Sequence, residues 1–246
     1  MPGSSRRVAS TFRGVDSKLP PFNLETGMSL NELLRRNRVH LLTGYRDSGK
    51  TRFILPAMLA WESRPPWAYV AADRSKLDAH ETIQDMGYQL EQIPIIYSYG
   101  AEHKSWRQLV EMFKLKEPRP EIAVIEAFQY LCPSLNRHSM VDEFMNTIDS
   151  YLQPSKDFPN GLTILGLTGG SKRSIRDRYP DPSMRVPGCA TWVERAGTIL
   201  LIEPAEGDHE FLDPDRNLYI CRKHGGSRLK MTGGFTPQNR LVFPDL

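Results

Sequence analysis

Residues 40–53 read HLLTGYRDSGKTRF, and the part from Gly44 to Thr51 fits the pattern G-x-x-x-x-G-K-[ST]. An apolar run typical of a strand precedes it and a stretch of helical periodicity follows it, which is the context that this motif requires. Glycines let backbone N–H groups turn inward around phosphate groups, and the next helix adds the positive end of its dipole. The stretch therefore predicts a phosphate-binding loop and, with it, an α/β fold.

The motif assigns a role to each of its polar residues. The Lys50 ammonium is expected to reach the β- and γ-phosphates of a nucleotide, and the Thr51 hydroxyl is expected to ligate Mg²⁺. The residues expected to bind the nucleotide within the motif are Gly44, Tyr45, Arg46, Asp47, Ser48, Gly49, Lys50 and Thr51. The motif therefore predicts a nucleotide site with Mg²⁺ as the metal. A chance glycine-rich turn is the alternative, and the flanking strand and helix argue against it.

The composition sets outer limits on the class of protein. The chain has 246 residues, 39% of them hydrophobic and 25% charged, as in an ordinary globular protein. No apolar run approaches the ~20 residues of a membrane span, and the first residues lack the apolar core of a secretory signal. The three cysteines form no C-x-x-C pair. We therefore expect a cytoplasmic protein with reduced thiols and no membrane contact.

Apolar runs of strand length alternate with helical stretches along the chain. The expected strands are 39–43, 67–72, 93–97, 122–125, 162–167, 198–202, 217–222 and 229–232. The expected helices are 29–37, 51–60, 76–86, 106–113 and 140–152. This alternation predicts a mostly parallel, twisted sheet flanked by helices, and the last three strands, with no helix between them, predict an antiparallel C-terminal edge. Residues 1–27 are expected to form an extended basic arm, followed by one domain over residues 28–246.

Polar residues follow three of the expected strands at the point where each strand ends. Asp73 follows the second strand, Glu126 follows the fourth, and Thr168 follows the fifth. Ligands of open α/β sheets lie at the carboxyl ends of parallel strands. We therefore expect these side chains to converge on the phosphate-binding loop. Either carboxylate alone could simply be a surface residue that ends a strand. The occurrence of both beside the motif favours a catalytic pair.

These segments resemble the RecA-type P-loop ATPases, and most closely the ring-forming DnaB-like replicative helicases and plasmid RepA-like helicases. The resemblance covers residues 28–235 and rests on GYRDSGKT, YVAADRS, IAVIEAF, RVPGCATWVERAGTILLIEP and LYICRKHGG. It implies a RecA-like P-loop NTPase core that assembles as a homo-oligomer, in a hexameric ring or a filament. It also implies DNA, in single-stranded form, and other replication or recombination proteins as partners.

The resemblance also implies roles for the residues at the strand ends. Asp73 stands where the family has the carboxylate that polarises the attacking water, which is usually glutamate. Glu126 stands at the end of the Walker B strand, where an aspartate usually holds Mg²⁺ through water. Thr168 stands at the place of a polar γ-phosphate sensor, commonly Gln or His. Relative to the family, the side chain after the second strand is thus shorter (Asp73 for Glu), and the one after the Walker B strand is longer (Glu126 for Asp).

A basic finger is implied by the segment LYICRKHGG near the end of the chain. Arg222, followed by Lys223 and His224, matches the basic residues that reach the nucleotide of the neighbouring subunit. An arginine finger stabilises charge in the transition state and is worth ~10³–10⁵ in rate. The alternative is a basic residue that protects an exposed edge strand from aggregation.

A long polar stretch at residues 168–189 is the expected nucleic-acid contact. Its basic residues with this expected role are Lys172, Arg173, Arg176, Arg178 and Arg185. Basic side chains neutralise phosphates, and an aromatic such as Tyr179 can stack on a base. In the resembled family this loop lines the central channel and holds the DNA backbone. The alternatives are a solvated charged loop, or a lid whose arginines contact ATP.

The sequence leaves several functions open. The first is a Mg²⁺-dependent ATPase that acts on DNA as a helicase-like ring. A single-strand recombinase or annealing ATPase would use the same core as a filament, although the chain lacks the F-x-x-A tetrad of RadA-type recombinases. A KaiC-like regulatory ATPase would work without DNA. A nucleotide-gated binding module would bind ATP and assemble with little turnover.

Overall fold

The computed structural model describes residues 30–45, 47–97, 105–170, 182–205, 215–222 and 228–244. The expected N-terminal arm lies outside these residues. The strands are β1 (Val39–Gly44), β2 (Trp67–Ala71), β3 (Ile95–Tyr97), β4 (Ile122–Ile125), β5 (Thr163–Gly169), β6 (Thr198–Pro204), β7 (Asp215–Arg222), β8 (Arg228–Phe235) and β9 (Leu241–Val242). The α-helices are α1 (Leu30–Leu33), α2 (Lys50–Ala60), α3 (Lys76–Asp85), α4 (Trp106–Lys114), α5 (His138–Leu152) and α6 (Thr191–Arg195).

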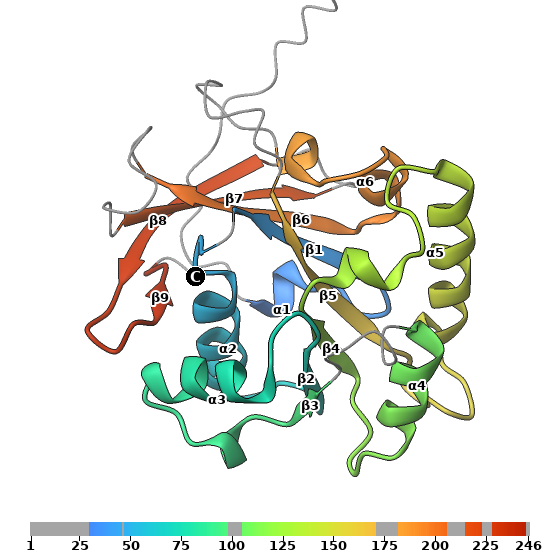
Figure 1. Ribbon diagram of the computed structural model, residues 1–246, viewed down its shortest axis with the longest axis horizontal. Coiled ribbons are helices and arrows are strands. Elements are labelled where there is room, and N and C mark those ends of the chain that lie inside the picture. Colours follow the sequence, from blue (N-terminus) through green and yellow to red (C-terminus); the bar gives the residue numbers. More distant parts are fainter. Residues whose placement is uncertain are drawn as a thin grey trace, which may run out of the picture.

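The strands form one mixed sheet in the order β3-β2-β4-β5-β1-β6-β7-β8-β9. Neighbouring strands from β3 to β6 run parallel, and those from β6 to β9 run antiparallel. This confirms the predicted α/β fold with a mostly parallel sheet and an antiparallel C-terminal edge. Figure 1 shows α2 and α3 on one side of the sheet and α4 and α5 on the other.

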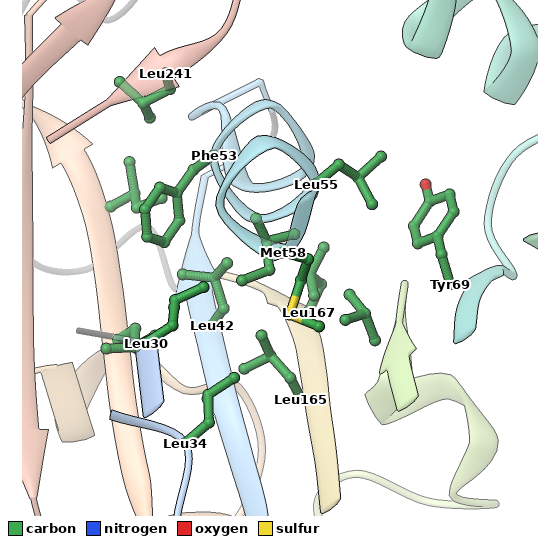
Figure 2. Close-up of a cluster of buried hydrophobic side chains, with 14 of the residues drawn as sticks. Leu30, Leu34, Leu42, Phe53, Leu55, Met58, Tyr69, Leu165, Leu167 and Leu241 are labelled. Atoms are coloured by element: carbon green, nitrogen blue, oxygen red, sulfur yellow. The ribbon is translucent and has the colours of Figure 1, made fainter. Parts of the chain in front are cut away.

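Apolar side chains fill both faces of the sheet, which explains why the strands read as continuous apolar runs. On one face, Phe53 and Met58 of α2 pack with Leu42 of β1 and Leu165 of β5 (Figure 2). On the other face, the buried residues of α4, α5 and α6 pack against the opposite sides of the same strands. The two clusters clamp the parallel strands and fix where their carboxyl ends lie.

The register of the strands brings the polar strand ends to one edge of the sheet. Thr43 lies beside Thr168 and Gly44 lies beside Gly169 in the β1–β5 pair. Ile125, the residue before Glu126, lies beside Gly166 of β5. Because β5 stands between β1 and β4 in the sheet, the loop after β1 and the two polar strand ends open on the same side.

Helix α1 and strand β9 differ from the sequence-based expectation. The helix expected over residues 29–37 is a single turn, α1, and the chain then turns through Asn37, which has a φ of 60°. The turn is needed because the chain must reverse to enter β1 at Val39. The strand β9 was not expected, since its two residues are too few to carry an alternating pattern. It pairs with β8 and contributes Leu241 to the core around α2.

A buried histidine in β1 gives the fold a measurable dependence on pH. His40 is fully buried, its Nε2 donates to the Arg35 carbonyl oxygen at 2.8 Å, and its Nδ1 has no hydrogen-bond partner among the described residues. Burial, aided by the nearby charges of Arg38 and Arg35 and opposed by the hydrogen bond to the Arg35 carbonyl, lowers the pKa of His40 from 6.5 to about 4. Protonation would bury a charged N–H without an acceptor.

We expect His40 to stabilise the fold at neutral pH and to lose that contribution in acid. Because the folded pKa lies below the unfolded one, the stabilisation is present above pH 6.5 and is lost as the pH falls through about 4. The full loss corresponds to about 3 kcal/mol of unfolding free energy. Urea unfolding of the wild type and of His40→Gln, from pH 7 to pH 4, measures it. Equal pH slopes in the two proteins would contradict the assignment.

Candidate functional site

The loop between β1 and α2, residues 45–49, leads directly into the first turn of α2. Asp47 and Gly49 have φ angles of 62° and 94°, both in the left-handed region. A Cβ on Gly44 would meet the Ile202 carbonyl oxygen and Ser48 Oγ, each at 2.6 Å. Gly49 precedes α2 and no side chain caps its first turn, so the positive end of the helix dipole faces the loop. Arg46 lies outside the described residues.

The Lys50 ammonium turns inward over this loop. Its Nζ donates to the carbonyl oxygens of Gly44 at 2.9 Å and Tyr45 at 2.7 Å, and contacts Ser48 Oγ at 3.4 Å. Burial lowers the pKa of Lys50 to about 8, against the opposing charges of Asp73, Asp47 and Glu126. A cation held in a ring of backbone oxygens is well placed to meet an incoming anion.

Thr51 and Glu126 meet at the base of the loop. The Thr51 hydroxyl donates to Glu126 Oε1 at 2.7 Å, and the Glu126 side chain is 2% exposed. Burial raises the pKa of Glu126 to about 7, opposed by the Arg74 charge. The two residues are 75 positions apart in the chain, and the sheet register alone brings them together. The motif predicted Thr51 as a magnesium ligand, and the family resemblance implied the same role for Glu126.

Arg74 is the site residue to which the sequence analysis assigned no role. Its Nη2 lies 2.8 Å from Glu126 Oε1 and donates to Thr51 Oγ1 at 3.5 Å. Its Nη1 donates to Thr82 Oγ1 of α3 at 2.9 Å. The available signal was its position immediately after Asp73, at the end of a strand that leads to the site. The direction of its side chain, however, is decided by Glu126, which a distant part of the chain supplies.

The remaining strand-end residues lie around this centre in different environments. The Asp73 side chain is 48% exposed and lies 3.7 Å from Arg74 Nε, and its negative charge acts on both Lys50 and Glu126. Thr168 is 1% exposed, and its Oγ1 has no hydrogen-bond partner within the described part of the chain. Such a buried, unpartnered hydroxyl is uncommon in proteins and is typical of a group that serves a ligand.

The donor set of the site fits a magnesium ion bound together with a nucleotide. Mg²⁺ prefers oxygen ligands and takes one or two from the protein, the rest coming from water and substrate phosphates. Thr51 supplies a hydroxyl and Glu126 a buried carboxylate, beside which the Tyr69 hydroxyl and the Asp73 carboxylate also lie. In the same residues, no group of three His, Cys, Asp or Glu side chains gathers as a metal site. A magnesium ion here would therefore depend on phosphate oxygens.

The structure corrects the expectation that Arg185 contacts nucleic acid. Arg185 is 1% exposed, and its Nη2 lies 2.7 Å from Glu203 Oε1 of β6. Its Nη1 donates to the Tyr45 hydroxyl at 3.3 Å, and its carbonyl oxygen accepts from Thr43 Oγ1 at 3.3 Å. A guanidinium buried among these partners cannot reach a phosphate backbone. The other basic residues with this expected role, Lys172, Arg173, Arg176 and Arg178, lie outside the described residues.

Replacing Arg185 with methionine is expected to destabilise the protein. The change leaves Glu203 buried without that cation, and breaking a buried ion pair from one side costs about 3–5 kcal/mol. The double variant Arg185→Met, Glu203→Leu should recover a large part, because it removes both charges. Urea unfolding measures the free energies. A single variant as stable as the wild type would show that the pair does not hold this segment.

Arg222 lies at the end of β7, away from the site of its own chain. Its Nη2 donates to the Glu32 carbonyl oxygen of α1 at 3.3 Å. The expected role of Arg222 concerns a neighbouring subunit and stays a prediction. Lys223 and His224 lie outside the described residues.

Comparisons with known proteins add no family to these observations. A scan against protein-family models and a search of the curated proteins each found no match. Within the described residues, no helix is long and apolar enough to cross a membrane. The function of the protein must therefore be inferred from the chemistry of the site.

Proposed function

We propose that the protein is a Mg²⁺-dependent ATPase of the RecA type that acts on DNA as a homo-oligomer, in a helicase-like ring or a filament. One observation carries the proposal: the Thr51 hydroxyl binds Glu126, from the end of another strand, at the base of a loop that holds the Lys50 ammonium. A loop of this sequence binds phosphates, and the paired hydroxyl and carboxylate are the oxygen donors that a nucleotide-bound Mg²⁺ uses.

The residues of the site would each contact a different part of the bound nucleotide, and Lys50 would exchange its hydrogen-bond partners to do so. Phosphate oxygens are stronger acceptors than carbonyls, so Lys50 would leave Gly44 and Tyr45 for the β- and γ-phosphates. Thr51 and Glu126 would hold the metal, which when bound offsets the charge that develops on the phosphates. Asp73 would orient the attacking water and accept its proton, and the Thr168 hydroxyl would bind the γ-phosphate. Arg222 of a neighbouring subunit would complete the site.

The attachment of the basic segment supports coupling between DNA and the nucleotide. The residues before that segment are packed on the phosphate-binding strand: a Cβ on Gly170 would lie 2.9 Å from the Gly44 carbonyl carbon. The Thr43 hydroxyl of the same strand donates to a residue on each side of the segment, to Gly169 O before it at 3.2 Å and to Arg185 O after it at 3.3 Å. A partner that pulls on residues 171–181 would therefore act directly on β1.

Steady-state ATP hydrolysis with Mg²⁺, in the presence and absence of single-stranded DNA, tests the proposal. Turnover that DNA stimulates supports an ATPase acting on DNA, and a forked duplex then separates a helicase, which unwinds it, from a recombinase, which coats single strands. Turnover that ignores DNA would contradict the DNA part and favour a regulatory ATPase. A protein that binds no nucleotide would contradict the proposal as a whole.

A second candidate, a nucleotide-gated binding module, is favoured by one feature of the site. Glu126 is engaged by Arg74, and Asp73 is short and half exposed, so both catalytic carboxylates depart from the arrangement expected for rapid hydrolysis. Such a module would bind ATP and assemble, and its turnover would be negligible. Sedimentation with and without ATP, measured beside hydrolysis, distinguishes it from the ATPase.

A further inference from the structure

The guanidinium of Arg74 occupies the place where the protein's own magnesium ligands meet. Glu126 Oε1 accepts from Thr51 Oγ1 at 2.7 Å and lies 2.8 Å from Arg74 Nη2. The third side of this triangle, from Arg74 Nη2 to Thr51 Oγ1, is 3.5 Å. The same buried oxygen, Glu126 Oε1, thus accepts a hydrogen bond from the Thr51 hydroxyl and pairs with the Arg74 guanidinium.

Arg74 and a magnesium ion would compete for the same oxygens. Mg²⁺ binds a hydroxyl oxygen at ~2.0–2.1 Å and keeps several waters around it. An ion held by Thr51 and Glu126 would therefore have the Arg74 guanidinium as a close positive neighbour. Leaving a buried carboxylate charge uncompensated is costly, so Glu126 is expected to keep one of these two cations beside it.

The surroundings of Arg74 provide it with other partners. Its Nη1 donates to Thr82 Oγ1 at 2.9 Å, and its Nε lies 3.7 Å from Asp73 Oδ1. The backbone after it is fixed, because Ser75 and Asp78 form a capping box at the start of α3. A rotation of the side chain alone would thus take the guanidinium from Glu126 towards Asp73 while it stays near α3.

We propose that Arg74 holds the place of the metal: its guanidinium binds Glu126 in the nucleotide-free protein and is exchanged for Mg²⁺ when the nucleotide enters. This inference rests on the proposed nucleotide site and adds a regulation to it. The exchange keeps Glu126 paired in both states. It also raises the Mg²⁺ concentration needed for nucleotide binding, because the ion must displace Arg74 from Glu126.

Titration of Mg²⁺ against the binding of a fluorescent nucleotide, mant-ATP, tests the exchange in the full chain. Arg74→Gln removes the competing charge, so its half-saturating Mg²⁺ concentration should fall on the order of tenfold, the scale on which a neighbouring like charge shifts an equilibrium. Arg52→Gln is the matched control. It makes the same change one residue from Thr51, where the side chain instead contacts Asp85 at 3.5 Å, and its Mg²⁺ requirement should equal that of the wild type.

Several outcomes would overturn the exchange. An unchanged Mg²⁺ midpoint in Arg74→Gln would make Arg74 a structural contact only. A loss of mant-ATP affinity in EDTA would instead make it a phosphate ligand. If Arg74→Gln fails to fold by circular dichroism, Arg74→Lys keeps the test open: with its charge retained, it should keep a midpoint close to that of the wild type, and a tenfold fall would contradict the inference. A wild type that binds no mant-ATP under any condition would refute the nucleotide site itself.

Discussion

Replacing Lys50 with alanine is expected to lower kcat/KM for ATP hydrolysis by about 10²–10³-fold, the effect of removing one preorganised donor from a charged transition state. The ammonium is held over the loop between β1 and α2 by the Gly44 and Tyr45 carbonyl oxygens. No other described lysine contacts these two oxygens. The loss should therefore appear both in nucleotide affinity and in turnover, as measured by mant-ATP binding and by phosphate release.

A matched variant separates this effect from a general loss of positive charge. Lys156→Ala removes the same ammonium from an exposed position in the loop after α5 and should hydrolyse ATP at the wild-type rate. Thermal unfolding should show that Lys50→Ala remains folded, since the buried ammonium is replaced without opening the core. A Lys50→Ala protein with wild-type kcat/KM would show that the loop does not bind the reacting phosphates.

Much of the fold was predictable because its signals are local. Apolar runs of strand length and helical periodicity occur in the sequence itself, and they predicted the alternation, the parallel sheet and the antiparallel edge. The convergence of Thr51, Glu126 and Thr168 was predictable for a related reason. In a parallel sheet, the residues that follow the carboxyl ends of the strands lie along one edge. Polar residues found directly after several such strands are therefore expected to lie near one another.

The ion pairs that Arg74 and Arg185 form with glutamates were not predictable in the same way. Arg185 belongs to a run of basic residues, a pattern that indicates solvent exposure, yet Glu203 on β6 draws it into the interior. Arg74 follows a carboxylate that could have engaged it, yet its shortest ionic contact is with Glu126. A long charged side chain can reach several partners, and only the tertiary structure decides which of them lies near. Sequence patterns therefore predict the position of its backbone but not its ionic partner.

Replacing Asp73 with asparagine is expected to reduce the rate of ATP hydrolysis by about 10²–10⁴-fold, the contribution of a positioned general base. Affinity for mant-ATP should change little, because asparagine has the same shape and the side chain is half exposed at the rim of the site. Single-turnover phosphate release, measured beside equilibrium binding, separates the two effects. Asp73→Glu, which restores the length usual in the resembled family, should retain hydrolysis if reach limits the reaction.

The control for this variant must account for the electrostatic effect of Asp73 on Lys50. Asp73 and Asp47 both oppose the lowering of the Lys50 pKa, so Asp47→Asn makes the same change in charge near the same ammonium. If Asp73 acts on the attacking water, Asp47→Asn should keep most of its hydrolysis while Asp73→Asn loses it. Equal losses would show that both aspartates act only through the charge of Lys50, and the base would then have to be sought elsewhere, first at Glu126, the other carboxylate at the site.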